Sequence, residues 1–120
     1  MIEVYSYARC STCQKALNWL AAKGVDAAVR DIKTEHPTAE QLRAAAEKSG
    51  LPLKRFFNTS GQLYRGMELS KKLPAMSEGE QLALLASDGM LVKRPLLVTE
   101  DKAFPGFREA EWAEILGLTD

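Results

Sequence analysis

In the first 32 residues, the spacing of hydrophobic residues is typical of a β-strand, then of a helix, and then of a second β-strand. Residues 2–7 alternate and carry β-branched and aromatic side chains, which predicts a β-strand. The apolar residues that follow recur on one helix face, namely Cys13, Ala16, Leu17, Leu20 and Ala21. Gly24 ends this helix, and residues 27–32 predict a second strand. A strand–helix–strand unit makes its two strands parallel, because the helix carries the chain back to the starting edge.

Two capping boxes predict helices in the middle of the chain. In each box a hydroxyl residue precedes a Gln or Glu by three positions, at Thr38-Ala-Glu-Gln41 and at Ser77-Glu-Gly-Glu80. Asp88-Gly89 closes the second helix. Between them, Phe56-Phe57 favours a short helix and residues 58–61 predict a turn, while the rest of segment 53–73 has no decisive pattern.

The last part of the chain predicts a hairpin and a final helix. Residues 96–99 and 102–104 flank the turn Glu100-Asp101, which makes two antiparallel strands. Residues 108–116 predict a helix whose inner face carries Trp112, Ile115 and Leu116.

These elements together define a fold class. They give one α/β domain over residues 1–120, with a helical insertion at about residues 36–90 between the second and third strands. A mixed four-stranded sheet of two parallel strands and a hairpin, flanked by helices, is the thioredoxin-like (glutaredoxin-like) architecture. We therefore expect this fold.

Composition and charge then narrow the classes of protein. The 120 residues are 46% hydrophobic, which excludes a disordered chain, and 16 basic against 16 acidic side chains leave no net charge. A neutral chain is not expected to coat nucleic acid or an anionic membrane. No apolar run approaches the ~18–20 residues of a membrane span, and residues 1–5 do not resemble a signal peptide. We expect a cytoplasmic protein with no membrane or direct nucleic-acid partner.

The strongest chemical signal is Cys10-Ser-Thr-Cys13, which lies between the first strand and the first helix. The spacing brings both sulfurs to one side of the helix start, close enough to form a disulfide. Unpaired N–H groups at a helix N-terminus favour a thiolate, and Arg9 adds a nearby positive charge. These features predict Cys10 as a nucleophile and Cys13 as its resolving thiol. The alternative is a pair of buried helix cysteines without a reaction.

A structural role for the cysteines is not expected. Two cysteines cannot form a secreted disulfide scaffold, and a reducing compartment would keep them as thiols. A structural zinc site needs four ligands, and the only histidine, His36, lies far away in a polar loop. We expect no bound metal and take His36 as a surface residue.

Lys93-Arg94-Pro95 directly precedes the hairpin and is the second chemical signal. Thioredoxin-like folds place a cis-proline there, beside the active cysteine, and cis bonds occur almost only before proline. Proline is also tolerated at the start of a strand, so the sequence alone does not decide between cis and trans. If Pro95 faces Cys10, the planar guanidinium of Arg94 is positioned to hold an oxyanion. The alternative for Arg94 is a surface salt bridge.

Taken together, these motifs resemble the thioredoxin-fold arsenate reductase family, in its branch related to the Spx and MgsR regulators. The resemblance covers essentially the whole chain. Its motifs are Tyr-x4-Cys-Ser-Thr-Cys-x-Lys-Ala-x3-Leu (5–20), Asp-Ile (31–32), Phe-Asn-Thr-Ser-Gly-x2-Tyr-Arg (57–65), Leu-Ala-Ser-Asp-Gly-Met-Leu-Val-Lys-Arg-Pro (85–95) and Gly-Phe (106–107).

The resemblance implies a set of site residues. In the family's arsenate reductases one cysteine attacks arsenate, which corresponds to Cys10, while arginines hold the oxyanion, corresponding to Arg94 and Arg108. A third family arginine falls at Asn58, and Arg65 is the nearby candidate to replace it. With the helix start included, the expected catalytic residues are Cys10, Cys13 and Arg94, and the expected substrate-binding residues are Arg9, Ser11, Thr12, Arg65, Pro95 and Arg108.

Three functions follow as hypotheses. The first is a thiol-dependent reductase of arsenate or a disulfide, resolved by Cys13 or by glutathione, a glutaredoxin or a thioredoxin, with no bound cofactor. The second is a regulator of the Spx type, whose Cys-x-x-Cys acts as a redox switch for binding the RNA polymerase α-subunit. The third is a protein that binds an anion or thiol metabolite without turnover.

Overall fold

The computed structural model describes residues 1–118, and the strands in this range form one mixed sheet. The strands are β1 (Glu3–Ser6), β2 (Ala28–Asp31), β3 (Leu96–Val98) and β4 (Ala103–Pro105), in the order β2-β1-β3-β4. β1 is parallel to β2, whereas β3 is antiparallel to both of its neighbours. The predicted thioredoxin-like sheet is therefore confirmed. The domain expected over residues 1–120 includes two residues that lie outside the described part.

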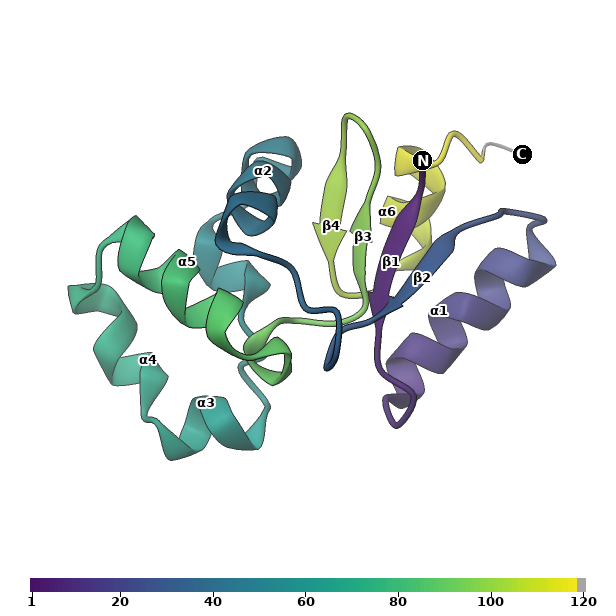
Figure 1. Cartoon of the computed structure of the whole chain (residues 1–120). Helices are drawn as coiled ribbons and strands as arrows, with labels where there is room; N and C mark the ends of the chain where they lie inside the picture. The colour runs from purple at the N-terminus through teal and green to yellow at the C-terminus, as the bar shows by residue number, and fades with distance from the viewer. Residues whose placement is uncertain (119–120) are drawn as a thin grey trace.

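One face of the sheet is covered by the first and last helices, α1 (Ser11–Ala22) and α6 (Glu109–Ile115) (Figure 1). Side chains alternate along each strand, so Val4, Leu97 and Phe104 share this face and pack into one core with the helices. Trp112 of α6 is completely buried, as predicted. Its indole N–H donates to the Gly106 carbonyl oxygen at 2.9 Å, which fixes α6 to the end of β4.

The opposite face is covered by the predicted helical insertion between β2 and β3 (Figure 1). The insertion contains α2 (Ala39–Ser49), α3 (Gln62–Gly66), α4 (Leu69–Lys72) and α5 (Glu78–Ser87), with the 3₁₀ turns η1 (Leu53–Phe56), η2 (Leu73–Ala75) and η3 (Gly89–Leu91). Tyr5, Leu96 and Ala103 point to this face and join its core. Both capping boxes form, at the starts of α2 and α5.

The structure adds detail where the hydrophobic pattern is weak. The short helix expected at Phe56-Phe57 is the 3₁₀ turn η1, and two short helices, α3 and α4, follow it. Glu68 separates α3 from α4 with a φ of 54°. The Gln81 side-chain amide of α5 donates to the carbonyl oxygens of Leu73 and Met76 at 3.3 and 3.2 Å. These two bonds join the end of this segment to α5.

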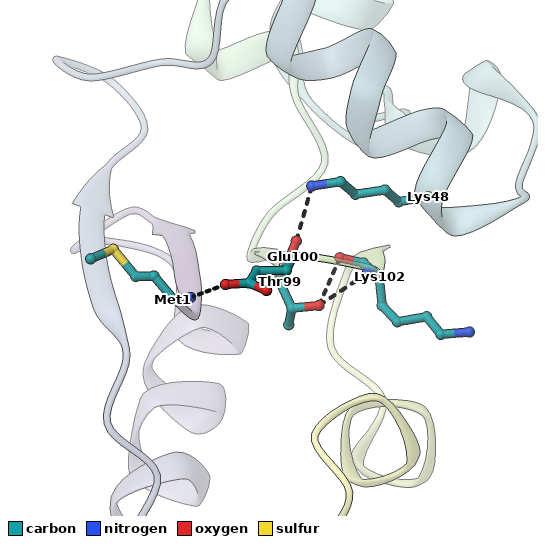
Figure 2. A network of polar contacts seen from close by, with 5 residues as sticks. All are labelled: Met1, Lys48, Thr99, Glu100 and Lys102. Carbon is teal, nitrogen blue, oxygen red and sulfur yellow. Dashed lines mark hydrogen bonds and ion pairs between the residues drawn. The ribbon is translucent and has the colours of Figure 1, made fainter.

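The turn of the predicted hairpin is tied to the insertion and to the N-terminus (Figure 2). Thr99 Oγ1 accepts from the Lys102 N–H at 3.0 Å, which closes the turn. Lys48 of α2 donates from Nζ to the Thr99 carbonyl oxygen at 3.0 Å. The N-terminal ammonium lies 3.7 Å from the Glu100 carboxylate, and this exposed ion pair contributes little. The Lys48 bond therefore fixes α2 over one end of the sheet.

Candidate active site

Cys10 occupies the N-cap of α1, directly after the turn that follows β1. Its backbone is extended, with φ −93° and ψ 114°, and its Sγ accepts from the Cys13 N–H at 3.3 Å. Its own N–H donates to the Tyr7 carbonyl oxygen at 3.0 Å. The sulfur thus takes the place that a Ser or Asp side chain takes at an ordinary N-cap. A thiolate there is stabilised by the helix N–H groups and by the positive end of the helix dipole.

Cys13 has the opposite environment, although it lies only one helical turn away. Its side chain is completely buried, whereas Cys10 is partly exposed, and both thiols are free. Burial raises the pKa of Cys13 to about 11, and the neighbouring Cys10 side chain adds to the rise. Cys13 is therefore a protonated thiol at neutral pH. The pair separates an accessible sulfur from a protected one.

Arg94 lies against the turn that carries Cys10. Its guanidinium carbon is 5.2 Å from the centre of the Tyr7 ring, and its Nη1 donates to the Met90 carbonyl oxygen at 3.4 Å. Within residues 1–118, Arg94 forms no ion pair with a carboxylate, and its buried Nε has no hydrogen-bond partner. The alternative of a surface salt bridge is therefore not what the described residues show. The Arg94–Pro95 peptide bond is cis, which decides the question that the sequence left open.

A cavity of about 260 Å³ lies beside the first turn of α1. Its lining residues are Thr12, Arg55, Lys93, Arg94, Phe104, Pro105, Gly106, Phe107 and Arg108. Four of them are cationic and none is acidic. Within residues 1–118, none of the four cations forms an ion pair with a carboxylate. This space, called the basic cavity below, therefore favours an anion.

The cations of the basic cavity come from segments that the backbone joins across the insertion. Phe57 and Val92 form an isolated antiparallel bridge. The Lys93 N–H donates to the Phe56 carbonyl oxygen at 2.8 Å, and the Asn58 N–H donates to the Leu91 carbonyl oxygen at 2.7 Å. This pairing sets the chain at Arg55 beside the chain at Lys93 and Arg94.

Gly106 connects the other side of the basic cavity to the core. Its N–H donates to the Pro95 carbonyl oxygen at 2.9 Å, and its carbonyl accepts from Trp112 Nε1 at 2.9 Å. Phe107 packs edge-on against Trp112, with ring centres 5.0 Å apart. These contacts position Arg108, the N-cap of α6, at the rim of the cavity.

The structure brings together only some of the residues expected from the sequence. Thr12, Arg94 and Arg108 meet at the basic cavity, whereas Cys10 and Cys13 are not among its lining residues. Arg9 and Ser11 are exposed beside Cys10, Arg65 is exposed in α3, and Pro95 is buried at the start of β3, and none of these four lines the cavity. Asn58, where the resemblance leads us to expect a third arginine, does not line it either.

Arg55 and Lys93 are cationic lining residues that were not among the site residues expected from the sequence. The two positions expected for a third arginine, Asn58 and Arg65, both lie outside the cavity lining. The signal available in the sequence was the basic pair Lys54-Arg55 directly before the two phenylalanines. That signal alone does not distinguish a cavity residue from a solvated one, because the long-range pairing places Arg55.

Among residues 1–118, no group of three or more His, Cys, Asp or Glu side chains is placed to hold a metal ion. His36 is exposed, as predicted. No helix in this range is both long enough and apolar enough to cross a membrane.

Comparison with known proteins places the chain in a family. YusI of Bacillus subtilis is 51% identical over 92% of this chain and 93% of its own length. The regulatory protein MgsR of the same organism is 29% identical over 89% of this chain and 83% of its own length. The crystal structure of an ArsC family related protein from Bacteroides fragilis superposes with a TM-score of 0.92 at 49% identity, covering 95% of this chain and 96% of the other. Residues 5–115 match the model of the ArsC family, and the chain therefore belongs to this family.

Proposed function

We propose that the chain is a thiol-dependent reductase in which the Cys10 thiolate attacks an anionic substrate. The observation that carries this proposal is a partly exposed cysteine at the N-cap of α1, the helix whose first-turn residue Thr12 lines a cavity with four cations and no acidic side chain. Nucleophilic catalysis needs an accessible thiol, and the N–H groups of a helix start favour an anion at the position of Cys10. Arg94, Arg108 and the N–H groups of α1 stabilise the charge of the substrate.

The buried Cys13 gives the reaction a second step. With a disulfide substrate, the Cys10 thiolate bonds to one substrate sulfur, the substrate S–S bond breaks, and the released thiolate takes a proton. Cys13 then loses its proton and attacks Cys10 Sγ, which releases the second thiol and leaves a Cys10–Cys13 disulfide. Two protein thiols supply the two electrons.

Arsenate fits the same pair of thiols. Cys10 forms a sulfur–arsenic bond as a hydroxyl group leaves as water. A second thiol, from Cys13 or glutathione, then attacks Cys10 Sγ, and arsenic leaves as arsenite with two more electrons. Glutathione, a glutaredoxin or a thioredoxin would return the protein to its reduced form, so the proposal requires a reductant and no bound cofactor.

The test is a steady-state assay of arsenate reduction and of disulfide reduction, each with glutathione and a glutaredoxin. The wild-type protein is expected to turn over at least one of the two substrates. The Cys10→Ser variant is the control, because it keeps the basic cavity and removes the nucleophile. If neither substrate turns over faster with the wild type than with this variant, the proposed reductase activity is excluded.

A second function is favoured by the dithiol itself and by the similarity to MgsR. We propose as the alternative that a Cys10–Cys13 disulfide switches binding to the RNA polymerase α-subunit. A pull-down with the C-terminal domain of that subunit, using reduced and oxidised protein, separates the two functions. Binding in one redox state supports the regulator, and no binding in either state removes it.

A further inference from the structure

Ser6, at the end of β1, is a polar side chain inside the core. It is 5% exposed, and within residues 1–118 no other Ser, Thr, Asn, Gln or charged residue is buried. Its backbone belongs to the sheet, since its carbonyl oxygen accepts from the Ile32 N–H at 2.8 Å. A buried hydroxyl costs free energy unless it has a hydrogen-bond partner. An apolar side chain of the same size would avoid this cost, so the hydroxyl calls for an explanation.

The alternation of side chains along β1 turns Ser6 toward α1. Val4 packs into the core that contains α1 and α6, and Ser6, two residues later, returns to the same face of the sheet. The start of α1 lies beside the end of β1, because the Cys10 N–H donates to the Tyr7 carbonyl oxygen at 3.0 Å. The first buried residue of that helix is Cys13. Ser6 and Cys13 therefore meet beneath the first turn of α1.

The end of β1 supplies two hydrogen bonds to the Cys13 sulfur. Burial raises the pKa of Cys13, whereas a hydrogen bond with the Tyr7 backbone and one with the Ser6 side chain each lower it. A hydrogen bond that lowers the pKa of a thiol stabilises the thiolate more than the thiol. Cys13 is completely buried, so these groups take the place that water has at an exposed thiolate. The Ser6 hydroxyl thus faces the sulfur that must lose its proton before it can attack.

We infer that Ser6 is a further catalytic residue, whose hydroxyl donates to the Cys13 thiolate while this thiolate attacks Cys10 Sγ. This inference rests on the proposed function and concerns its resolving step. In the mixed disulfide of Cys10, Cys13 releases its proton to solvent and its sulfur bonds to Cys10 Sγ. The bond between Cys10 and the substrate sulfur breaks, and the leaving thiolate takes up a proton. The two protein thiols are oxidised, the substrate disulfide is reduced, and Ser6 is unchanged.

The test separates the two steps of disulfide reduction, with dithiodipyridine as a neutral probe. Attack by Cys10 releases one thiopyridone at a rate proportional to the probe concentration. Closure of the Cys10–Cys13 disulfide releases a second thiopyridone at a rate independent of that concentration. Stopped-flow absorbance follows both phases for the reduced protein from about pH 7 to pH 11, and Cys13→Ser, which cannot close, identifies the first phase. Intact mass spectrometry identifies the mixed disulfide and the closed form.

Ser6→Ala should slow closure at neutral pH by about threefold to tenfold, because the thiolate loses a charge-assisted hydrogen bond. The thiolate that forms without this bond is more basic and more nucleophilic, which offsets part of the loss. The difference from the wild type should therefore shrink as the pH rises and Cys13 ionises in both proteins. The first phase should not change, since Cys10 keeps its place at the helix N-cap.

Two further variants separate the hydroxyl from the shape of the side chain. Ser6→Thr keeps the hydroxyl and adds a methyl group that a β-strand favours, so its closure should be faster than that of Ser6→Ala. Ser70→Ala is the matched control, because Ser70 is an exposed serine of α4, and both of its phases should match the wild type.

The two phases also distinguish the failure of this inference from that of the proposed function. Equal closure rates in the wild type and Ser6→Ala overturn the inference and leave the two-thiol reductase in place. A loss that is the same at every pH, or one that is equal in Ser6→Thr and Ser6→Ala, shows a structural role and also overturns it. A first phase without a second overturns it too, and leaves a reductase that an external thiol resolves. A first phase no faster than that of Cys10→Ser counts against the proposed function and this inference together.

Discussion

The two parts of the candidate site are built in different ways. The part on α1 consists of contiguous residues, in which Cys10 caps the helix that contains Thr12 and Cys13. The cationic part gathers Arg55, Lys93 and Arg108 from segments that lie far apart in the sequence. Helix capping, which acts over three or four residues, is enough to position the first part. The second part depends on backbone pairing between distant segments.

The two parts of the site should respond differently to mutations in the insertion. The proposed nucleophile, Cys10, depends on the start of one helix, so changes in the insertion should leave it in place. The positions of the cations depend on the pairing of residues 56–58 with residues 91–93. They also depend on the close approach of Gly89, just before the second of these segments, to Ile32. A change within the insertion should therefore reduce the selectivity for anions before it removes the reactivity of Cys10.

Replacing Cys10 by serine has the largest expected effect. A serine hydroxyl is not ionised at neutral pH without an adjacent base, so arsenate or disulfide reduction should fall to the rate measured without protein. Steady-state assays check this expectation. Cys13→Ser is the contrasting variant, because it keeps the attacking sulfur and should accumulate a mixed disulfide of Cys10 that intact mass spectrometry detects. Turnover by Cys10→Ser would show that the α1 part does not carry the chemistry.

The second largest expected effect is on stability, from Gly89→Ala. A Cβ at this position would lie 1.9 Å from the carbonyl oxygen and 2.8 Å from the carbonyl carbon of Ile32. These are backbone atoms, so η3 must move away from the end of β2, at a cost of about 3 kcal/mol or more. Urea unfolding measures the loss of free energy. Where the variant folds, its selectivity for anions over neutral substrates should also fall.

Gly66→Ala is the control for the change from glycine to alanine. Gly66 ends α3, and a Cβ there has nothing within 4 Å. Alanine in a helix is favoured over glycine by about 0.5–1 kcal/mol, so this variant should be as stable as the wild type or more stable. Equal losses in the two variants would contradict the close approach of Gly89 to Ile32.

The sequence predicts well what local patterns determine. The strand–helix–strand start, both capping boxes, the hairpin and the inner face of Trp112 all appear in the structure. The position of Cys10 at a helix start belongs to the same class, because the change from strand to helical spacing marks it. Each of these signals spans a few residues, and the structure needs no distant partner to realise it.

The sequence predicts poorly what distant backbone contacts determine. Arg55 enters the basic cavity because residues 56–58 pair with residues 91–93, and no local pattern announces this pairing. Arg65 is near Asn58 in the sequence but does not replace the expected arginine in the cavity. It is exposed in α3 and lies outside the cavity lining. Gly89 was expected only to close a helix, whereas its contact with Ile32 leaves no room for a side chain.

The free energy of unfolding should depend on pH through the buried Cys13 of the α1 part. Folding raises the pKa of Cys13 from an ordinary value of 9.0 to about 11. Between these values the unfolded chain loses the proton and the folded chain keeps it, so stability falls as the pH rises from about 9 to 11. Two pKa units correspond to about 2.7 kcal/mol at most. Urea unfolding at pH 8 and pH 10.5 measures the difference.

Cys13→Ser isolates this contribution from the other groups that titrate at high pH. Serine does not ionise in this range, so the variant should lose less stability than the wild type between the two pH values. Its overall stability can be lower, because a buried hydroxyl replaces the thiol. Equal losses in the two proteins would mean that Cys13 is not protected in the folded state.

The smallest expected effect comes from the caps of the insertion helices. Thr38→Ala and Ser77→Ala each remove a hydroxyl that accepts from the N–H of the third helical residue at 3.1 Å. Each should cost about 1 kcal/mol in urea unfolding, and Thr34→Ala, at another exposed threonine, should cost less. The caps act on the first turns of α2 and α5, far in sequence from the pairing that gathers the cations. The selectivity for anions should therefore stay at the wild-type value in the cap variants, whereas Gly89→Ala lowers it. A parallel fall in the cap variants would show that the cationic part responds to overall stability rather than to its own backbone contacts.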